Sequence, residues 1–487
     1  MSIHWKLQDL IPEWVDQPAA GIVVSAVSQD SRKIEPGSLF IARIGLQHRG
    51  IDFVESAVNN GAAAVLVDST EFSDCPKVSV PVIAIDQLNS EIGKIASRFY
   101  SSPSESLCVI GVTGTNGKTS CAHFTAQAMN ALGVKTAIIG TVGNGFPGEL
   151  ATATHTTPDA IGLQKLFAEL KAAGAEAVVM EVSSHALEQE RVAAVNFDYA
   201  LFTNLSRDHL DYHGDMESYG AAKARLFKSF NLKAAIINRD DEFGRLLLSD
   251  NQIKGKKVSV GRMQGDYSAS AYRLSLRGVE TQLKTPQGSL QFISPVVGEF
   301  NLDNLLLVAA VLLEQGISIE DVAKSISALE SVPGRMQTVS SEGCPLVIID
   351  YAHTPDALEK ALSSAKAHTA GKLWCVFGCG GDRDQGKRAL MGAAADKLAD
   401  RIVVTSDNPR SESPEQIISM IQAGIDLHTP AIETDRALAI RLAIKEASTE
   451  DVILIAGKGH EDYQEVEGKR LPFSDLLVCQ QALGVAA

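Results

Sequence analysis

The sequence lacks the cysteine pattern of a disulfide-linked or zinc-binding protein. Its seven cysteines are an odd number scattered over 487 residues, and no two of them form a Cys-x-x-Cys pair. Disulfide frameworks and zinc sites normally show an even set or a close pair. We therefore expect reduced thiols, most of them buried, and no zinc site.

A long hydrophobic run and an excess of positive charge are also missing. The longest strongly apolar stretch, Leu305 to Leu313, is far shorter than the ~20 residues that cross a bilayer. The first residues, MSIHWK, show no basic region followed by an apolar signal core. The net charge of −15 argues against a nucleic-acid-binding or membrane-surface protein. We expect a monomeric, cytoplasmic protein that binds neither nucleic acid nor membrane.

What the chain does contain is an alternation of short, β-branched apolar runs with stretches of helical period. Examples of the apolar runs are Val78–Ile85, Cys108–Gly111 and Ala177–Val182, and a helical stretch is Ile161–Ala173. Such alternation predicts α/β domains with parallel sheets, whose functional residues lie at the carboxyl ends of the strands.

The length predicts about three domains. A polar turn at Ser101–Ser104 and the segment Val332–Arg335 are candidate boundaries, so we expect domains at residues 1–100, 101–334 and 335–487. Residues Val258 to Pro295 are strand-like but less regular.

The most informative segment is Gly111 to Thr119, with the sequence GVTGTNGKT, between an apolar run and the helix-like stretch Ser120–Leu132. A glycine-rich loop between strand and helix turns backbone N–H groups toward an anion. Lys118 then reaches the outer phosphates, and the Thr119 hydroxyl can hold Mg²⁺. Val112 replaces the first glycine of the usual pattern. The setting nevertheless favours a nucleoside triphosphate site over a glycine turn with an exposed lysine.

Two polar segments follow later apolar runs. Glu181 ends one run and is either a Mg²⁺ ligand or an ordinary strand-end carboxylate. The segment Asn204–Gly214 is dense in potential metal and phosphate ligands, and His209 and His213 are spaced to share a helical face. No Glu follows His209 as in a zinc protease, so a polar loop is the alternative.

Three cationic side chains are ambiguous when the residues alone are considered. Lys223 lies in the helix-like segment Tyr219–Phe227, and its spacing alone predicts a solvated surface lysine. Arg383 and Arg410 lie in loops after predicted strands. Each guanidinium could bind a carboxylate bidentately or form a surface ion pair.

Taken together, these segments resemble the Mur ligases of peptidoglycan synthesis nearly from end to end. The resemblance rests on ten blocks in the family's order: Thr113–Thr119, Glu181–His185, Asn204–Gly214, Tyr219–Lys223, Gly298–Asn304, Gly334–Arg335, Asp350–Pro355, Gly378–Asp384, Asp407–Arg410 and Gly457–Asp462. It implies an α/β fold with a UDP-muramoyl-substrate domain at 1–100, a central P-loop ATPase domain at 101–334 and a Rossmann-like amino-acid-binding domain at 335–487.

The resemblance further implies ATP as a cosubstrate and Mg²⁺ as a cofactor. Lys118, His209 and Lys223 are the implied catalytic residues, and Lys223 matches the lysine that the family carries as a carbamate. The implied metal ligands are Thr119, Glu181, His209 and the carbamate of Lys223. The implied ATP-binding residues are Gly114, Thr115, Asn116, Gly117, Lys118, Thr119, Ser120, Asn301, Asn304, Arg335 and Asp350.

Two more small-molecule sites are implied. The UDP-muramoyl-dipeptide would contact Gln29, Ser31, Leu46, Gln47, His48, His155, Thr156, Thr157, Ser183, Gln189 and Arg191. His155 departs from the relatives, which carry Asn there. The block Asp407–Arg410 is similar to the signature of the members that add meso-diaminopimelate. That amino acid would contact Arg383, Asp407, Asn408, Pro409, Arg410, Gly457 and Glu461.

The implied activity is an ADP-forming acid–amino-acid ligase that works through an acyl phosphate. A lysine-adding member is one alternative, against which Arg410 argues because lysine has no second carboxylate. Folylpolyglutamate synthetase is another, but it lacks the Asp-Asn-Pro-Arg block. A non-catalytic nucleotide-dependent switch or ATPase, from a different class, would need neither Arg383 nor Arg410.

Overall fold

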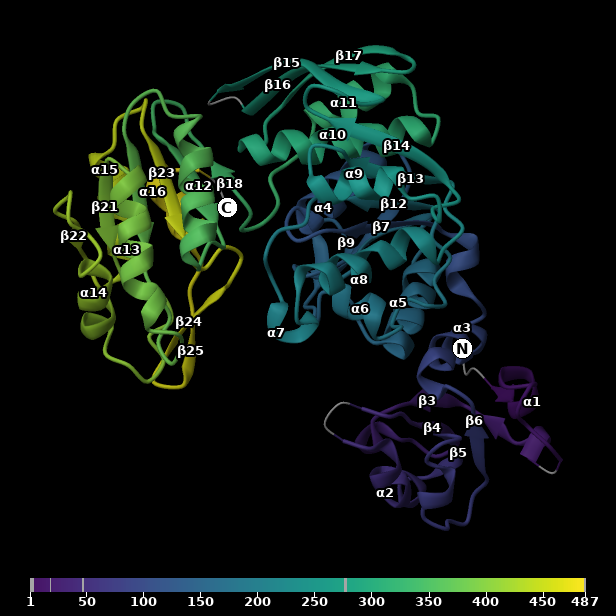
Figure 1. The fold of residues 1–487 in the computed structure, drawn as a ribbon. Helices are drawn as coiled ribbons and strands as arrows, with labels where there is room; N and C mark the ends of the chain where they lie inside the picture. Colours follow the sequence, from purple (N-terminus) through teal and green to yellow (C-terminus); the bar gives the residue numbers. More distant parts are fainter. Residues whose placement is uncertain (1–3, 18, 46–47, 276–277, 486–487) are drawn as a thin grey trace. The chain divides into compact units, whose positions relative to one another are not determined.

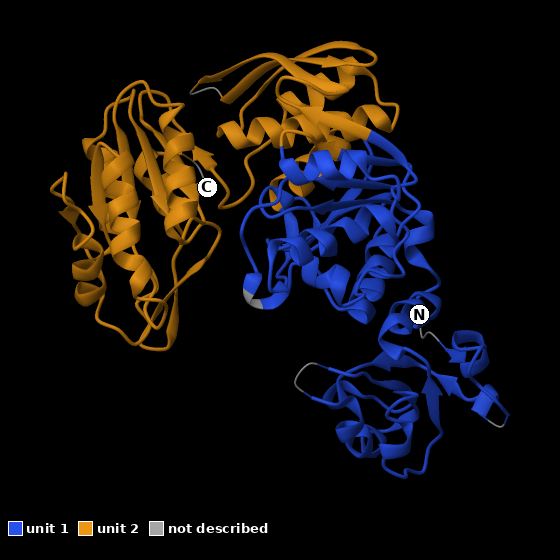
Figure 2. Cartoon of the chain, viewed as in Figure 1, with its two compact units in different colours: residues 1–118, 133–236, 241–257 blue, residues 119–132, 237–240, 258–487 orange. Residues whose placement is uncertain are grey.

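The computed structural model describes residues 4–17, 19–45, 48–275, 278–485 and divides them into two compact units (Figures 1 and 2). Unit 1 contains residues 1–118, 133–236 and 241–257, and unit 2 contains residues 119–132, 237–240 and 258–487. In the described part of the chain, no helix is long and apolar enough to cross a membrane. The domain boundaries expected near residues 100 and 334 stay predictions.

The amino-terminal part of unit 1 is a small parallel sheet. Its strand order is β3-β4-β5-β6, and all three neighbouring pairs are parallel. Apolar residues cover both faces of the sheet, in one cluster with helix α3 and another with helix α2. The elements are β1 (Trp5–Lys6), α1 (Leu7–Leu10), β2 (Val23–Val24), β3 (Ala26–Ser28), β4 (Ser38–Ala42), α2 (Val54–Asn59), β5 (Ala62–Asp68), β6 (Val82–Ile85) and α3 (Leu88–Phe99). The run predicted from Val78 thus becomes a strand only at Val82.

The rest of unit 1 is built on strands β10-β9-β8-β11-β7-β12-β13 of an 11-stranded sheet, whose order continues with β14-β15-β16-β17. Strand β7 (Cys108–Thr113) lies between β11 (Ala177–Glu181) and β12 (Tyr199–Phe202) and is parallel to both. The carboxyl ends of all three strands therefore meet at one edge. The other elements are β8 (Thr136–Ile139), β9 (Asn144–Phe146), β10 (Glu149–Ala151), α5 (Ala160–Ala172), α6 (Ser184–Glu188), α7 (Leu210–His213), α8 (Met216–Lys228), β13 (Ala234–Asn238) and α9 (Glu242–Ser249).

Helix α4 starts at Lys118, the lysine of the glycine-rich loop, and its residues from Thr119 onward belong to unit 2. The irregular section predicted from Val258 to Pro295 contains long antiparallel strands, β15 to β17, with a bulge between Ala269 and Ala271. The elements are α4 (Lys118–Ala131), β14 (Lys256–Gly261), β15 (Tyr267–Ser275), β16 (Gly278–Thr285), β17 (Gly288–Ser294), α10 (Glu299–Glu314) and α11 (Ile319–Ser327).

The carboxyl-terminal part of unit 2 is a doubly wound sheet with the order β18-β19-β23-β20-β21-β22. Only β18 is antiparallel to its neighbour. Helices α12, α13 and α14 pack on one face, and α15 and α16 pack on the other (Figure 1). The elements are β18 (Gln337–Val339), β19 (Leu346–Asp350), α12 (Pro355–Lys366), β20 (Leu373–Phe377), α13 (Gly386–Leu398), β21 (Arg401–Val404), α14 (Pro414–Gln422), β22 (Ala431–Ile432), α15 (Arg436–Glu446), β23 (Val452–Ala456), β24 (Tyr463–Val466), β25 (Lys469–Pro472) and α16 (Asp475–Leu483).

Candidate active site

The glycine-rich loop follows β7 and is fastened to the residues after the neighbouring strand β12. Asn204 accepts a hydrogen bond from the Asn116 N–H on its side-chain oxygen (3.0 Å) and one from the Thr115 N–H on its carbonyl oxygen (2.8 Å). Gly114 and Gly117 have φ values of +147° and +86°, which favour glycine. A Cβ at Gly114 would collide with the Thr203 hydroxyl. The loop is therefore held in one shape by backbone contacts that the motif alone does not specify.

The Lys118 amine lies against the carbonyl groups of this loop. Its Nζ donates to the carbonyl oxygens of Gly114 and Thr115, both at 2.9 Å. Thr119 and Ser120 follow in the first turn of α4 and are nearly buried. A lysine at the entrance of a loop of backbone N–H groups is the arrangement that stabilises a polyphosphate.

Lys223 is buried, so the expectation of a solvated surface lysine is wrong. Only 1% of the residue is exposed, its Nζ donates to the Gly114 carbonyl oxygen (2.9 Å), and it lies 4.4 Å from the centroid of the Tyr219 ring. Tyr219, Ala222 and Leu226 are buried on the same helix, at the spacing of one helical face. Burial, and then the charge of Lys118, lower the pKa of Lys223 to about 6. The amine is therefore mainly neutral at pH 7.

Glu181 lies beside the phosphate loop because the register of β11 pairs it with Val112 of β7. Its side chain is buried, with 1% of the residue exposed. The Thr141 N–H donates to one carboxylate oxygen (2.8 Å) and the Thr141 hydroxyl donates to the other (3.2 Å). An oriented carboxylate next to a phosphate loop offers the oxygen donors that Mg²⁺ prefers.

The two histidines of the polar segment have different surroundings. His209 precedes helix α7 with a positive φ of 52° and lies 3.5 Å from the Asp208 carboxylate. His213 contacts the Ser184 hydroxyl through Nε2 (2.9 Å) and the Glu188 carboxylate through Nδ1 (3.0 Å). His213 is thus occupied on both nitrogens, and only His209 is exposed enough to take a ligand. Across the described residues, no group of three or more His, Cys, Asp and Glu side chains is arranged for a metal ion.

The residues expected at the dipeptide form a connected network near Glu181. The Thr157 hydroxyl donates to the Glu181 carbonyl oxygen (2.9 Å) and accepts from the Ser183 N–H (3.2 Å). The Thr156 hydroxyl is hydrogen-bonded to that of Thr141 (3.0 Å). The exposed His155, in contrast, contacts only its neighbour Thr154 through Nδ1 (3.1 Å) among the described residues.

Arg191 is the cation of this network. Its Nη1 donates to the Thr157 carbonyl oxygen (2.9 Å), and its Nε donates to the Gln189 side-chain oxygen (3.0 Å). Burial is the main cause that lowers its pKa. Within the described ranges no carboxylate forms an ion pair with Arg191. A half-buried guanidinium held by neutral oxygens is suited to bind an anionic group of a substrate.

The residues expected at the uridine pocket lie in the amino-terminal sheet region. Gln29 follows β3 and is half-buried, and Ser31 is buried with its carbonyl oxygen accepting from Asn60 (2.9 Å). His48 is exposed. Leu46 and Gln47 lie outside the described residues.

The residues expected at the nucleotide base and ribose lie in unit 2. Asn301 and Asn304 are buried on α10, where Asn304 donates to the Asn301 side-chain oxygen (2.8 Å) and accepts from the Cys121 thiol (3.3 Å). Asp350 ends β19, and its carboxylate accepts from the backbone N–H groups of Met336 and Ala352. Burial raises the pKa of Asp350.

The side chains of Arg383 and Arg410 both lie close to Gly380, at the carboxyl edge of the carboxyl-terminal sheet. A Cβ built on Gly380 would lie 3.0 Å from the Arg410 Nη1 and 3.7 Å from the Arg383 Cγ. Arg410 donates to the Gly381 carbonyl oxygen (2.8 Å), and its Nε lies 3.3 Å from the Glu465 carboxylate. Arg383 is exposed and has no ion pair with another described residue. Two arginines from neighbouring loops with a single carboxylate partner favour binding of a further carboxylate.

The backbone loop that carries Arg410 is held by a buried polar network. The Asn408 side-chain oxygen accepts from the Lys458 Nζ (3.0 Å) and the Glu465 N–H (2.8 Å), and its amide nitrogen donates to Glu461 (2.9 Å). Lys458 is fully buried, and burial raises the pKa of the neighbouring Asp407. Sequence reasoning missed Lys458, although its position between two glycines directly after β23 was a usable signal.

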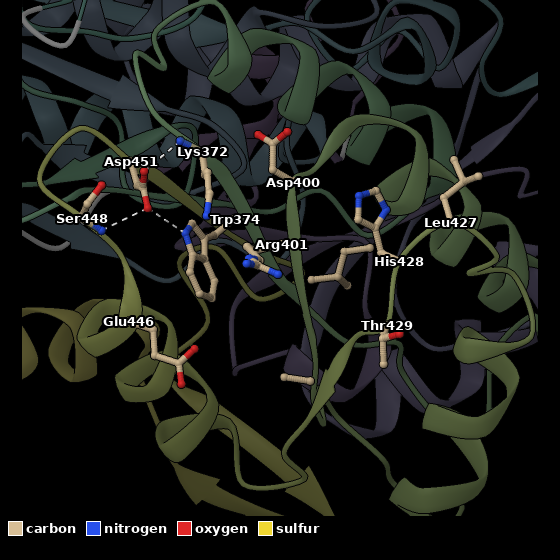
Figure 3. A pocket seen from close by; sticks show the side chains of 12 residues that line it. Lys372, Trp374, Asp400, Arg401, Leu427, His428, Thr429, Glu446, Ser448 and Asp451 are labelled. Carbon is tan, nitrogen blue, oxygen red and sulfur yellow. Dashed lines mark hydrogen bonds between the residues drawn. The ribbon is translucent and has the colours of Figure 1, made fainter.

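A cavity of about 660 Å³ lies at the opposite edge of the same sheet (Figure 3). Lys372 precedes β20, Arg401 begins β21 and Asp451 precedes β23, whereas the Asp407 and Gly457 loops follow the other ends of β21 and β23. Asp451 accepts from the Trp374 indole N–H (3.1 Å). This cavity is therefore separate from the predicted amino-acid site.

Family models match three successive segments of the chain. The Mur ligase family catalytic domain matches residues 23–100, the Mur ligase middle domain residues 112–312, and the Mur ligase glutamate ligase domain residues 334–459. The three-domain α/β architecture expected from the sequence is thereby confirmed.

Similar proteins agree with these matches. A protein of Coxiella burnetii named UDP-N-acetylmuramoyl-L-alanyl-D-glutamate–2,6-diaminopimelate ligase is 47% identical over 477 residues, 95% of this chain and 96% of the relative. A protein of the same name from Pseudomonas aeruginosa is 46% identical and covers 98% of each chain. A solved structure of a ligase with this name is 36% identical, covers 99% of both chains and has a TM-score of 0.78. MurF from Acinetobacter baumannii, at 20% identity and a TM-score of 0.64, shares the fold. The chain therefore belongs to the Mur ligase family.

Proposed function

We propose that this chain is an ATP-dependent ligase that adds meso-2,6-diaminopimelate to UDP-N-acetylmuramoyl-L-alanyl-D-glutamate in peptidoglycan precursor synthesis. Nearly full-length similarity to proteins of that name supports the reaction. The observation that carries the choice of amino acid is that the side chains of Arg383 and Arg410 both lie close to Gly380. Diaminopimelate has a distal carboxylate for such a pair, and lysine does not.

The reaction has two steps that this chain's residues support electrostatically. A γ-carboxylate oxygen of the D-glutamate attacks the γ-phosphorus of ATP, and ADP leaves. The diaminopimelate amine then attacks the acyl carbon and forms a C–N bond. The bond between the acyl carbon and the phosphate oxygen breaks, phosphate leaves, and the amine loses a proton. In the first step two anions must approach each other, so Lys118 and the N–H groups of Gly114–Thr119 stabilise the charge that moves between them.

A magnesium ion is part of the proposal, because Glu181 offers a carboxylate beside the loop. Thr119, Glu181, His209 and a carbamate on Lys223 are the proposed ligands, and the ion supplies positive charge that neutralises the phosphate oxygens when it is bound. Glu181 is already oriented for this role by Thr141.

The environment of Lys223 supports carbamylation. A carbamate forms when a neutral amine adds to CO₂, which makes an N–C bond and releases one proton. The lowered pKa keeps Lys223 neutral at the pH of a cell. The modification replaces a cation that would repel the metal with an anionic oxygen ligand.

The acceptor and the amino acid would bind to different parts of the chain. Arg191, Thr157 and their hydrogen-bonded neighbours would hold the dipeptide carboxylate, and the region of Ser31 would hold the uridine nucleotide. The ligands are small and soluble, which supports the proposal of a cytoplasmic enzyme. A monomer is also proposed.

A ligation assay tests the proposal directly. Purified protein is given ATP, Mg²⁺ and the UDP-muramoyl-dipeptide with either meso-diaminopimelate or lysine, while ADP release and product mass are followed. We expect a tripeptide product with diaminopimelate and far slower turnover with lysine. Equal use of lysine would refute the amino-acid assignment, and ATP hydrolysis without any ligated product would favour a nucleotide-dependent ATPase.

A further inference from the structure

Three buried polar atoms in the carboxyl-terminal part of unit 2 have no hydrogen-bond partner among the described residues: Nε of Arg335, Nε of Arg388 and Nδ1 of His460. Arg388 is already held by an ion pair with Glu412, whereas Arg335 and His460 belong to two loops that touch. Buried polar atoms are nearly always satisfied, and an unsatisfied one carries the full cost of its desolvation. Two such atoms near each other point to a ligand that supplies the missing partner.

The packing of two loops brings these side chains together. The Arg335 guanidinium lies 5.3 Å from the centroid of the Tyr351 ring, and the His460 ring centroid lies 5.5 Å from the same ring. A Cβ on Gly334 would collide with the backbone nitrogen of His460, so the two loops are in direct contact there. Gly334 has a φ of +65° and also accepts a hydrogen bond from the Tyr351 N–H (2.9 Å). The arrangement is fixed by the backbone and not by side-chain rotamers alone.

The chemistry of the pair favours an anionic oxygen. Burial, and then the charge of Arg335, lower the pKa of His460, so its imidazole stays neutral beside the guanidinium. A neutral imidazole can carry its proton on Nδ1 and donate it, while Arg335 offers its Nε–H. Two donors with one positive charge suit a phosphate oxygen.

We infer that His460 is a nucleotide-positioning residue, which donates from Nδ1 to the same phosphate group as the Nε–H of Arg335. The inference rests on the proposed assignment of Arg335 to the ATP phosphates. His460 is neither a metal ligand nor a diaminopimelate contact in this assignment. Its neighbour in the chain, Glu461, is the residue proposed to bind diaminopimelate.

This adjacency gives the loop a second role, the coupling of the two substrates. The Glu461 N–H donates to the Lys458 carbonyl oxygen (3.0 Å), and its carboxylate is held by Lys458 and Asn408. A nucleotide that binds His460 therefore contacts the same loop that carries Glu461. Binding of the nucleotide should tighten binding of diaminopimelate, and by thermodynamic reciprocity the reverse should hold.

The test uses three substitutions that separate the two ring nitrogens. His460→Asn retains an amide donor near the position of Nδ1, His460→Gln places its amide near Nε2, and His460→Ala has neither. Binding of magnesium AMP-PNP to the full chain is measured by calorimetry, with and without diaminopimelate. Loss of one hydrogen bond to a charged group predicts about tenfold weaker binding for His460→Ala and His460→Gln, with His460→Asn within about threefold of the wild type. His460→Ala should also lose the coupling to diaminopimelate.

Two further variants make the outcome decisive. His428→Ala, at the opposite edge of the sheet beside the cavity of Figure 3, is the matched control and should bind like the wild type. Arg335→Ala tests the assignment beneath the inference. If Arg335→Ala weakens AMP-PNP binding but no His460 variant does, the inference is wrong and the proposed function stands. If Arg335→Ala also binds normally, the phosphate assignment itself is wrong. Equal losses in all three His460 variants with lowered melting temperatures would show a purely structural role and overturn the inference.

Discussion

Lys223 gives the sharpest chemical prediction because its burial sets the fraction of amine that can react with CO₂. With a pKa of about 6, roughly 0.9 of the amine is neutral at pH 7, whereas ~0.0003 would be neutral at the ordinary value of 10.5. The neutral fraction at pH 7 is thus raised about three thousandfold. We expect Lys223 to be carbamylated selectively over the other lysines of the chain.

The assay is ¹³C NMR of the protein in ¹³C-labelled bicarbonate at pH 7 to 8. A carbamate resonance should appear for the wild type and vanish in Lys223→Met. Lys228 is the matched control, because it lies on the same helix but is ion-paired with Asp250 at 2.7 Å. Lys228→Met should retain the resonance. The activity of Lys223→Ala should be nearly lost and partly restored by a small carboxylate such as formate.

The pH dependence provides a second check on the same reasoning. The resonance should weaken as the pH falls through about 6, because the amine becomes protonated there. A protein that shows no resonance in saturating ¹³C-bicarbonate and retains full activity after CO₂ is removed would refute the argument. So would a resonance that persists in Lys223→Met.

Three other predictions follow from the site. Lys118→Ala should fold normally but form ADP about 10²–10³-fold more slowly, since it removes a charge used in phosphoryl transfer; near-normal ADP release by the folded variant would contradict this. Arg410→Ala should lose several kcal/mol of transition-state stabilisation with diaminopimelate, Arg410→Lys should not restore it, and ATP affinity should stay unchanged; unaltered kcat/KM would contradict it. Lys223→Met should raise the unfolding midpoint in bicarbonate-free buffer. Between pH 6 and 10.5 the unfolded chain binds one proton more at Lys223 than the folded chain does, which lowers the free energy of unfolding of the wild type. This destabilisation, which the substitution removes, is complete below pH 6, is about 3 kcal/mol at pH 8, and is lost as the pH rises through 10.5. A gain that does not change with pH would contradict the last prediction.

Much of the fold could be predicted because its signals are local. Alternating strands and helices predicted parallel sheets, and polar residues after apolar runs predicted loops at the carboxyl edges. Glu181 beside the phosphate loop and Arg410 after β21 both follow from that rule. The helix after the phosphate loop was also predicted, within two residues of its observed start at Lys118. The roles of Lys118 and Thr119 came from the glycine-rich loop and most other residue roles came from family resemblance; all of them stay predictions.

The burial of Lys223 was missed although its signal was present in the sequence. Tyr219, Ala222 and Leu226 are separated by three or four residues and define an apolar stripe, and Lys223 lies within it. The spacing was interpreted as that of a solvated surface lysine, in keeping with the rarity of buried lysines. The stripe shows that position in the helical period can overrule the average behaviour of a side chain. A charged residue inside such a stripe is a candidate for a perturbed pKa.

The role of Asn408 depends on contacts that no local pattern could predict. The sequence suggested that its amide would bind the amino-acid substrate. In the structure that amide bonds to Lys458 and Glu461, which lie 50 and 53 positions further along the chain. A buried polar group that is already satisfied gains little from another partner, but its removal leaves a buried lysine and a carboxylate unpaired. Asn408 is therefore better suited to fix the loop before Arg410 than to contact the substrate. The proposed recognition of the distal carboxylate by Arg410 would then depend on how rigidly this network holds the guanidinium.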